Sequence, residues 1–252
     1  NSSDHTDTSE DLLDLSRMGV IQAFPLLTAV HKHANDRFVE AVAAVLTLHT
    51  RVMIIGNKQA NFFPTEWLNW TRDVCKGKIG PVLDDIISRL PYDSEFLETF
   101  LSNGIVNQAG AARHMLRRLD LVVSYASGVH IHEVDVEHIL PKSVSTKLTN
   151  ESNLGPDQLS WLSSLGHLPL PSTPQGQRKL GETIAGYTNK LGNIALLHQT
   201  PNRAAKDKPL QAKLLGYSEM KLTLSNEIAS ETKWTNEEID KRHQRLSELI
   251  VQ

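Results

Sequence analysis

The sequence predicts a mainly α-helical fold, with a helical N-terminal half and one small region of strands in the C-terminal half. Two observations support this prediction. In the first half, apolar residues recur at helical spacing, and Gly and Pro residues separate the periodic segments. After residue 128 the pattern changes to the alternation of apolar and polar residues that is typical of a strand. We therefore expect a flexible lead-in at 1–15, a helical scaffold at 16–126 and a second region at 127–252.

The first half contains five segments with helical signals. In the first segment Phe38, Val42, Val45 and Leu46 follow an i, i+4, i+7, i+8 spacing, which places them on one face of a helix. The other helices are predicted at 65–75, 81–90, 94–101 and 108–125. None of these segments presents a cluster of catalytic residue types. We therefore expect this half to act as a scaffold or as a docking surface.

The second half begins with a predicted strand at 130–140, which alternates apolar and polar residues and is closed by Pro141. The stretch 141–190 is rich in Ser, Thr, Pro and Gly and is predicted as a long loop with one short helix at 157–165. A second strand is expected at 191–197 and a helix at 202–215. Thr235 and Glu238 form a capping box that opens a C-terminal helix at 236–250.

Length and composition are ordinary for a globular protein, with 252 residues of which 40% are hydrophobic. The apolar run around Val39 to Leu48 is broken by polar residues well short of the roughly 20 that a membrane span needs, so no transmembrane helix is expected. The first ten residues lack the basic start and apolar stretch of a secretory signal. One cysteine, Cys75, excludes an intrachain disulfide and a thiolate zinc cluster, and it is predicted to be a small buried residue. This composition fits a cytoplasmic protein.

The net charge of −3 argues against a protein that coats nucleic acid. The distribution is uneven, because ten Lys or Arg and only five Asp or Glu occur between Ile139 and Lys221. This local excess is compatible with a phosphate-facing site. An unevenly charged solvated surface explains it equally well.

The residues best suited to chemistry occur in three short motifs. Glu137 and His138 close the first predicted strand, Asn193 lies in the second, and Asn202 precedes the following helix. Hydrolysis of a phosphodiester needs a base for water and a cation for the developing charge. Histidine has a suitable pKa for the first task, and Mg²⁺ held by carboxylate and amide oxygens suits the second.

The order and spacing of these motifs resemble those of the HNH superfamily of ββα-metal nucleases, and more closely the C-terminal nuclease domain of GmrSD-type modification-dependent restriction enzymes. The resemblance covers roughly residues 115–252. It rests on the segments 136–141 and 191–197, on Asn202 nine residues after Asn193, and on Trp234 with Arg242. It implies a small ββα-metal core formed by the two strands and the helix at 202–215.

Residue by residue, the resemblance implies that His138 is the general base and that Glu137 is a metal ligand. Asn193 would hold the loop that orients His138, and Asn202 would be the second metal ligand. The sequence departs from the family pattern at two of these positions, since many relatives carry histidine in place of Asn202 and aspartate in place of Glu137. Oxygen ligands favour Mg²⁺ or Mn²⁺ over zinc.

The function that the resemblance implies is metal-dependent DNA cleavage, one strand at a time, with 5′-phosphate and 3′-hydroxyl products. Relatives usually carry an N-terminal ParB-like nucleotide-hydrolysing domain that senses DNA modification. This sequence has no comparable phosphate-binding signature. We therefore expect the chain to be the effector portion of a larger restriction or antiphage defence protein that acts on DNA and not at a membrane.

Basic residues near the motifs are candidates for contacts with the DNA backbone. Arg203 and Lys206 are the preferred pair, because they lie one turn apart beside the expected metal ligand. Lys142, just beyond Pro141, is a third candidate. Lys208 and Lys213 of the same region are expected to be surface charge.

The strand periodicity raises one difficulty for this assignment. In a regular strand Asp135 and Glu137 point to one face, and His138 points to the other. Glu137 and His138 serve one site only if the strand bends or ends there. Pro141, three residues later, favours an end.

Alternative interpretations remain for most of these residues. A non-catalytic adaptor could keep the same scaffold and bind DNA or a partner, and Asn202 could serve only as a helix N-cap. A different metallohydrolase could use His130 and His132 together with His138, although adjacent strand residues point to opposite faces. We expect His130 and His132 to be ordinary strand residues, and Trp161 and Trp234 to be core anchors.

Overall fold

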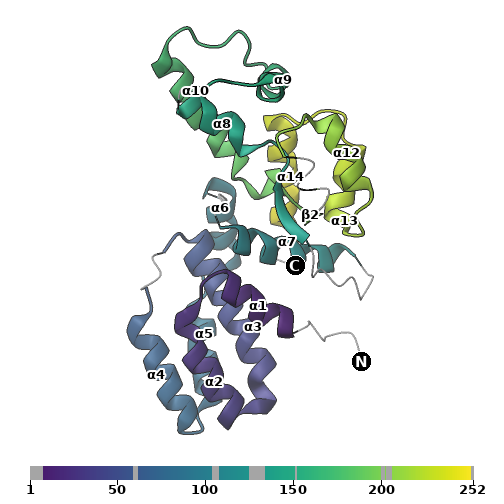
Figure 1. The fold of residues 1–252 in the computed structure, drawn as a ribbon. Helices are drawn as coiled ribbons and strands as arrows, with labels where there is room; N and C mark the ends of the chain where they lie inside the picture. Colours follow the sequence, from purple (N-terminus) through teal and green to yellow (C-terminus); the bar gives the residue numbers. More distant parts are fainter. Residues whose placement is uncertain are drawn as a thin grey trace. The chain divides into compact units, whose positions relative to one another are not determined.

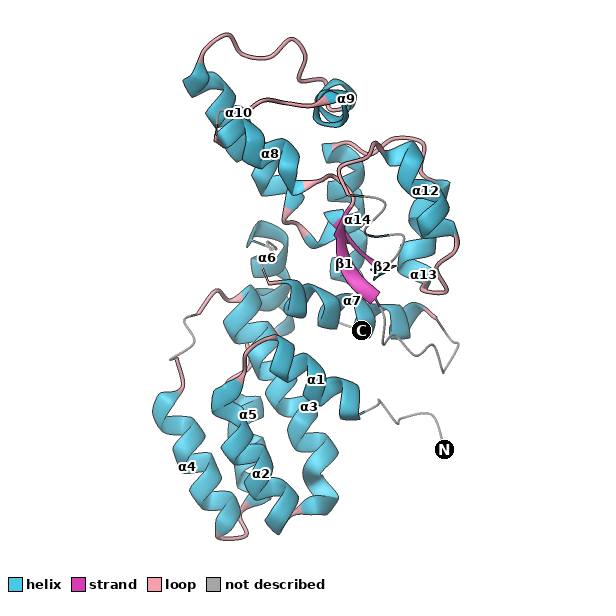
Figure 2. Ribbon diagram, in the orientation of Figure 1, coloured by secondary structure: helices cyan, strands magenta, loops and turns pink. Residues whose placement is uncertain are grey.

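The computed structural model describes residues 8–58, 62–103, 108–124, 134–150, 152–199, 202 and 206–250. Within these ranges the chain is mostly helical, and it contains one antiparallel pair of strands (Figures 1 and 2). The prediction of a mainly helical chain with a small sheet is confirmed. The chain divides into two compact units, the first comprising residues 1–103 and 108–114 and the second comprising residues 104–107 and 115–252.

The first unit is a bundle of helices, coloured purple to blue in Figure 1. Its helices are α1 (Thr8–Arg17), α2 (Phe24–His33), α3 (Phe38–Leu48), α4 (Pro64–Cys75), α5 (Ile79–Ser88), α6 (Asp93–Asn103) and the beginning of α7 (Ala109–Val123). The short 3₁₀ turns η1 (Ile21–Ala23) and η2 (Asn35–Arg37) precede α2 and α3, and the π-helix η3 (His49–Ile55) continues α3. The five helices predicted in this half are therefore present within a few residues of their predicted bounds.

Two expectations for the first unit were wrong. Residues 8–15 belong to helix α1 and not to a flexible lead-in, because Asp14 and Leu15 are fully buried in the bundle. Residues 1–7 of that lead-in lie outside the described residues. Cys75 is exposed, since it is the last residue of α4 and the neighbouring Val74 takes the buried position.

The continuous helical stretch Asn35–Ile55 is long and apolar enough to cross a membrane by length and composition alone. In the structure, 39% of its most apolar part is buried within the chain. The core helix of a soluble protein passes the same test, so this helix is weak evidence for a membrane span.

The second unit surrounds the strand pair of β1 (Val134–His138) and β2 (Ile194–His198), drawn in magenta in Figure 2. Its helices and 3₁₀ turns are the rest of α7, α8 (Lys142–Thr149), α9 (Pro156–Ser164), α10 (Pro174–Thr188), η4 (Leu191–Asn193), α12 (Leu210–Ser218), α13 (Thr223–Asn226), η5 (Glu227–Ser230) and α14 (Asn236–Leu249). Helices α12 and α13 pack against β2, whose first four residues are buried. Trp161 and Trp234 are each 2% exposed, which confirms them as core anchors.

The predicted loop at 141–190 is mostly helical, which corrects the sequence interpretation. Only the short helix α9 was expected there. Helices α8 and α10 lie side by side (Figure 1), and Gly181 permits this, because a Cβ at that position would collide with the backbone of Ser145 and Thr149. Tertiary packing of this kind outweighs the weak helix propensity of a Ser- and Thr-rich sequence.

The two strands are shorter than predicted. Residues 130–133, which include His130 and His132, lie outside the described residues. In the second predicted strand, residues 191–193 form the 3₁₀ turn η4 and pairing begins at Ile194. The capping box of Thr235 and Glu238 is confirmed at the start of α14.

Candidate active site

The end of β1 is the centre of the candidate site. His138 pairs with Ile194 and Glu137 pairs with Ala195, and His138 is the last residue of β1. The backbone N–H of Ile139 then donates to the Asn193 carbonyl at 3.0 Å. The chain leaves the strand directly after His138, and Glu137 and His138 are themselves both paired within β1.

Asn193 fixes the turn that follows β1. Its side chain is fully buried, its Oδ1 accepts from the Leu140 N–H at 2.8 Å, and its Nδ2 donates to the Leu140 carbonyl at 3.0 Å. The same side chain donates to the Thr188 carbonyl at 3.0 Å and accepts from Trp234 Nε1 at 3.0 Å. One asparagine thus ties the turn after His138 to α10 and to the segment before α14.

The packing of η4 on α14 places Asn193. A Cβ on Gly192 would collide with the carbonyl of Ile239 and with the backbone of His243, so only glycine allows this close approach. Arg242 of α14 donates to the carbonyls of Gly192 at 2.8 Å and Ile194 at 2.7 Å. Burial lowers the pKa of Arg242 to about 10, which still leaves the guanidinium charged at neutral pH.

His138 is neutral at ordinary pH. Burial lowers its pKa to about 4, and the nearby charges of Lys142 and Lys213 lower it in the same direction. Its Nε2 atom is buried and has no hydrogen-bond partner among the described residues. A neutral imidazole with a nitrogen lone pair can accept a proton.

Glu137 forms an ion pair with a buried lysine. Its side chain is 8% exposed, and its Oε1 accepts from Lys213 Nζ at 2.5 Å. Burial raises the pKa of Glu137, and the Lys213 ammonium group opposes that rise. The expectation that Lys213 is surface charge was wrong, because its side chain is 0% exposed.

Asn202 lies beside β1, since its Nδ2 donates to the Val136 carbonyl at 3.4 Å. The helix predicted at 202–215 is not continuous. Residues 206–207 form a turn with Lys206 at a φ of +36°, and helix α12 begins only at Leu210 after Pro209. Proline fixes its own φ and favours an extended residue before it, so a helix does not pass through Lys208.

Glu137 and Asn202 carry oxygen donors of the kind that a hard divalent cation prefers. Glu137 offers a carboxylate and Asn202 an amide oxygen, and Asn202 contacts the strand one residue away from Glu137. Such oxygen ligands suit Mg²⁺ and Mn²⁺. Lys213 binds one of the two carboxylate oxygens of Glu137, so a metal at this carboxylate would share it with an ammonium group.

The predicted DNA-binding residues have different placements. Lys142 is exposed in the first turn of α8, close enough to lower the pKa of His138. Lys206 is exposed in the turn before α12. Arg203 lies outside the described residues.

Sequence reasoning missed two residues of α12 that line this site. Lys213 and Tyr217 share the buried face of α12 with Leu210, and the charge of Glu137 adds to the burial that raises the pKa of Tyr217 well above its usual value. The i, i+3, i+7 spacing of these three positions was a usable signal. A lysine between two core positions of an amphipathic helix indicates a buried partner.

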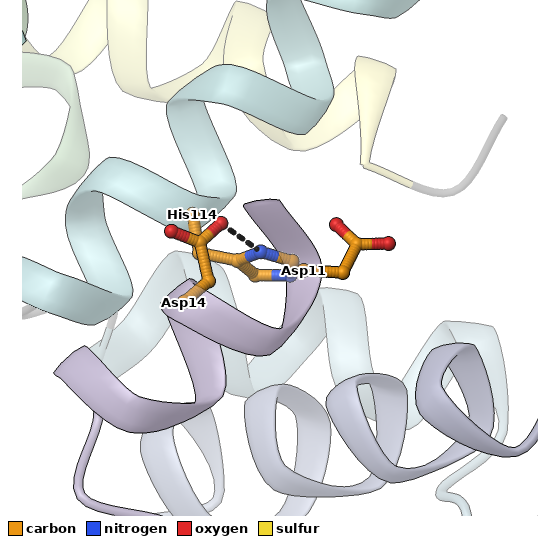
Figure 3. A group of neighbouring side chains, drawn as sticks. All are labelled: Asp11, Asp14 and His114. Carbon is orange, nitrogen blue, oxygen red and sulfur yellow. Dashed lines mark hydrogen bonds and ion pairs between the residues drawn. The ribbon is translucent and has the colours of Figure 1, made fainter. Parts of the chain in front are cut away.

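A second group of potential metal ligands lies in the first unit, where Asp11, Asp14 and His114 place their donor atoms within 4.8 Å of one another (Figure 3). This group is already filled by ion pairs. Asp14 accepts from His114 Nδ1 at 3.0 Å and from an Arg113 nitrogen at 2.9 Å, and Arg113 also contacts Glu10. A guanidinium group this close opposes a divalent cation, so these residues form a structural network.

Residues 90–249 match the model of a protein family described as GmrSD restriction endonucleases, C-terminal domain. The matched segment contains α7, both strands and every candidate site residue. No curated protein sequence matches the chain.

Proposed function

Because this chain belongs to the family of GmrSD restriction endonuclease C-terminal domains, we propose that it is a metal-dependent DNA endonuclease with His138 as its general base. The family assigns a nuclease domain of a restriction system, with DNA as the substrate. The base, the metal ligands and the description of β1, β2 and the segment from Asn202 as a ββα-metal core belong to our proposal.

The observation that carries this proposal is the pair of hydrogen bonds between the Asn193 side chain and the Leu140 backbone. They hold both polar backbone groups of a residue that lies two positions after His138. A general base must be fixed within hydrogen-bonding distance of the water that it activates. A buried asparagine that immobilises the adjoining turn supports this role for His138.

The remaining residues have defined tasks in this reaction. His138, neutral above its low pKa, accepts the proton of the attacking water. Glu137 and Asn202 would hold Mg²⁺ or Mn²⁺, which supplies charge stabilisation at the scissile phosphate. Lys142, Arg203 and Lys206 would bind the DNA backbone on either side of the reacting bond.

The proposal extends to the biological setting. A single site of this kind attacks one strand at a time, so nicking is the expected elementary event. The chain would act in the cytoplasm as the effector part of a larger restriction or antiphage defence protein, under the control of an N-terminal ParB-like nucleotide-hydrolysing domain.

Relaxation of supercoiled plasmid in Mg²⁺ or Mn²⁺ tests this function. The His138→Ala variant should lose cleavage by about 10²- to 10⁴-fold, the usual contribution of a general base. His198→Ala is the matched control, because His198 is an exposed histidine at the end of β2 in the same sheet. EDTA should stop the native chain.

Two results would contradict the proposal. Equal cleavage by His138→Ala and the native chain would remove His138 from the mechanism. A native chain that binds DNA and never cleaves it, with either metal, would favour the adaptor interpretation.

A further inference from the structure

The fully buried lysine of α12 is the least expected feature of the site. Lys213 has 0% side-chain exposure, and burial lowers its pKa while the Glu137 charge opposes that change. A buried lysine is stable only when its charge is paired and its N–H groups are bonded. The partners of Lys213 therefore indicate what it does.

All three N–H groups of the ammonium have an acceptor at the end of β1. Lys213 Nζ lies 2.5 Å from Glu137 Oε1, 3.1 Å from the His138 carbonyl and 3.1 Å from the Ile139 carbonyl. These acceptors belong to three consecutive residues, and the middle one is the candidate base. The Asn193 side chain holds the next residue, Leu140.

The charge of Lys213 acts on the same carboxylate that we assign to the metal. A fixed ammonium group next to Glu137 competes with a divalent metal cation for the Glu137 carboxylate, and it also repels that cation. Asp207 also acts on the charges of Glu137 and Lys213, and its Oδ2 accepts from Gln158 Nε2 at 3.0 Å. The carboxylates of Glu137 and Asp207 thus both act on the Lys213 ammonium group.

We propose that Lys213 is a positioning residue of the nuclease site, which fixes Glu137 and the His138–Ile139 backbone and weakens the binding of a divalent cation at Glu137. This inference rests on the proposed function for the role of the site. Its metal-binding part is independent of cleavage. Lys213 thereby holds the catalytic strand end in place and keeps the metal exchangeable.

Mn²⁺ binding to the full chain without DNA, measured by isothermal titration calorimetry, tests the proposal. Lys213→Met keeps the length of the side chain and removes its charge, and it should bind Mn²⁺ at least about tenfold more tightly than the native chain. Lys213→Arg keeps the positive charge and should bind Mn²⁺ as the native chain does. Lys221→Met is the matched control, because Lys221 is exposed just beyond α12.

Cleavage gives the second readout. At saturating Mn²⁺, Lys213→Met should cleave plasmid at least about tenfold more slowly, because the strand end is no longer fixed. A lysine with a purely structural role would lower stability and activity without tightening Mn²⁺ binding, and that outcome would overturn the proposal. Undetectable Mn²⁺ binding in both the native chain and Lys213→Met would overturn it as well.

A folding defect of Lys213→Met does not remove the test. The double variant Glu137→Gln/Lys213→Met removes both buried charges together, so it should fold and should fail to bind Mn²⁺ at this site. Tight Mn²⁺ binding by this double variant would contradict the proposal. If the native chain never cleaves DNA while the Lys213→Met contrast in Mn²⁺ binding holds, the proposed function fails and the effect of Lys213 on metal binding stands.

Discussion

Among the described residues, each unit contains a buried histidine with a strongly lowered pKa. The pKa of His49 in the first unit and that of His138 in the second are both lowered to about 4, and burial is the largest cause for each. Both also have a buried Nε2 without a hydrogen-bond partner among the described residues. By these criteria the two histidines are equivalent.

Their surroundings are different. His49 lines a cavity of about 200 Å³ together with apolar side chains that include Met53, Phe63 and Trp67. His138 adjoins Glu137, has Asn202 beside its strand and has two lysines close enough to act on its pKa. A low pKa therefore reports burial, and the oxygen donors and cations around His138 are what make its site a candidate for chemistry.

The acidic groups of the two units allow the same comparison. Asp14 in the first unit and Glu137 in the second are buried carboxylates paired with a cation from a distant helix. Asp14 accepts from a histidine and an arginine, whereas Glu137 shares one oxygen with one lysine. We expect the first group to stabilise its unit and the second to serve a reaction.

Arg113→Met should produce the largest change, a loss of about 3–5 kcal/mol in the stability of the first unit, because it removes the buried guanidinium partner of Glu10 and Asp14 and leaves only the half-exposed Arg17 guanidinium beside them. Native-state hydrogen exchange of the α1 and α3 amides measures this effect. Arg72→Met, on the exposed side of α4, should change stability by less than about 0.5 kcal/mol. Equal protection in both variants would show that the network is not structural.

His49→Leu tests whether the buried histidine of the first unit affects only stability. The pKa of His49 is about 4 in the folded chain and about 6.5 when exposed, so the unfolded state binds the extra proton between these values. Above pH 6.5 His49 is neutral in both states, and the free energy of unfolding keeps its full value. As the pH falls from 6.5 toward 4, protonation of the unfolded state lowers the free energy of unfolding by at most about 3 kcal/mol.

The pH dependence of exchange protection in the first unit, from pH 7 to pH 4, measures this contribution. His49→Leu should flatten it, and His33→Gln, at an exposed position of α2, should leave it unchanged. DNA cleavage at neutral pH should be the same in His49→Leu and in the native chain. A cleavage defect as large as that of His138→Ala would break the distinction between the two histidines.

The sequence predicted those parts of the molecule that depend on local patterns. The helices α3 to α7 and the capping box of Thr235 and Glu238 follow from spacing within short segments. Where a partner lies far away along the chain, prediction failed. Helix α1 can bury acidic side chains because Arg113, 99 residues after Asp14, forms ion pairs with them. Lys213 can be buried because Glu137, 76 residues earlier, accepts a hydrogen bond from it.

The prediction of a long loop between the two strands failed for a related reason. The residues of α8 and α10 have weak helix propensity, and the two helices are stabilised by packing on each other. Gly181 belongs to the Ser-, Thr-, Pro- and Gly-rich stretch that was predicted as a loop, and it is required at a close contact between helices. Local composition therefore predicted a loop where packing between two helices determines the secondary structure.

Addition of Mn²⁺ should distinguish the acidic group around Asp14 from the one around Glu137. The expected change in stability is smaller than for the variants above. At tenfold excess over its Kd, a ligand that binds only the folded state adds about 1.4 kcal/mol of stability. Asn202→Ala should lose this gain, whereas Asp11→Asn should keep it, because Asp11 belongs to the group in the first unit. Exchange protection of the β1 and β2 amides with and without Mn²⁺ measures it. Loss of the gain in Asp11→Asn would move the metal to the first unit.

Lys142→Ala should have the smallest effect, because one exposed phosphate contact contributes little to the affinity for DNA. Removal of one such contact should lower the slope of log affinity against log salt by about one. Fluorescence anisotropy of a short duplex in EDTA, over a range of salt concentrations, measures the slope without cleavage. Lys241→Ala, at an exposed position of α14, is the control. An unchanged slope in Lys142→Ala would show that Lys142 does not contact a phosphate. The effect of its charge would then be to lower the pKa of His138.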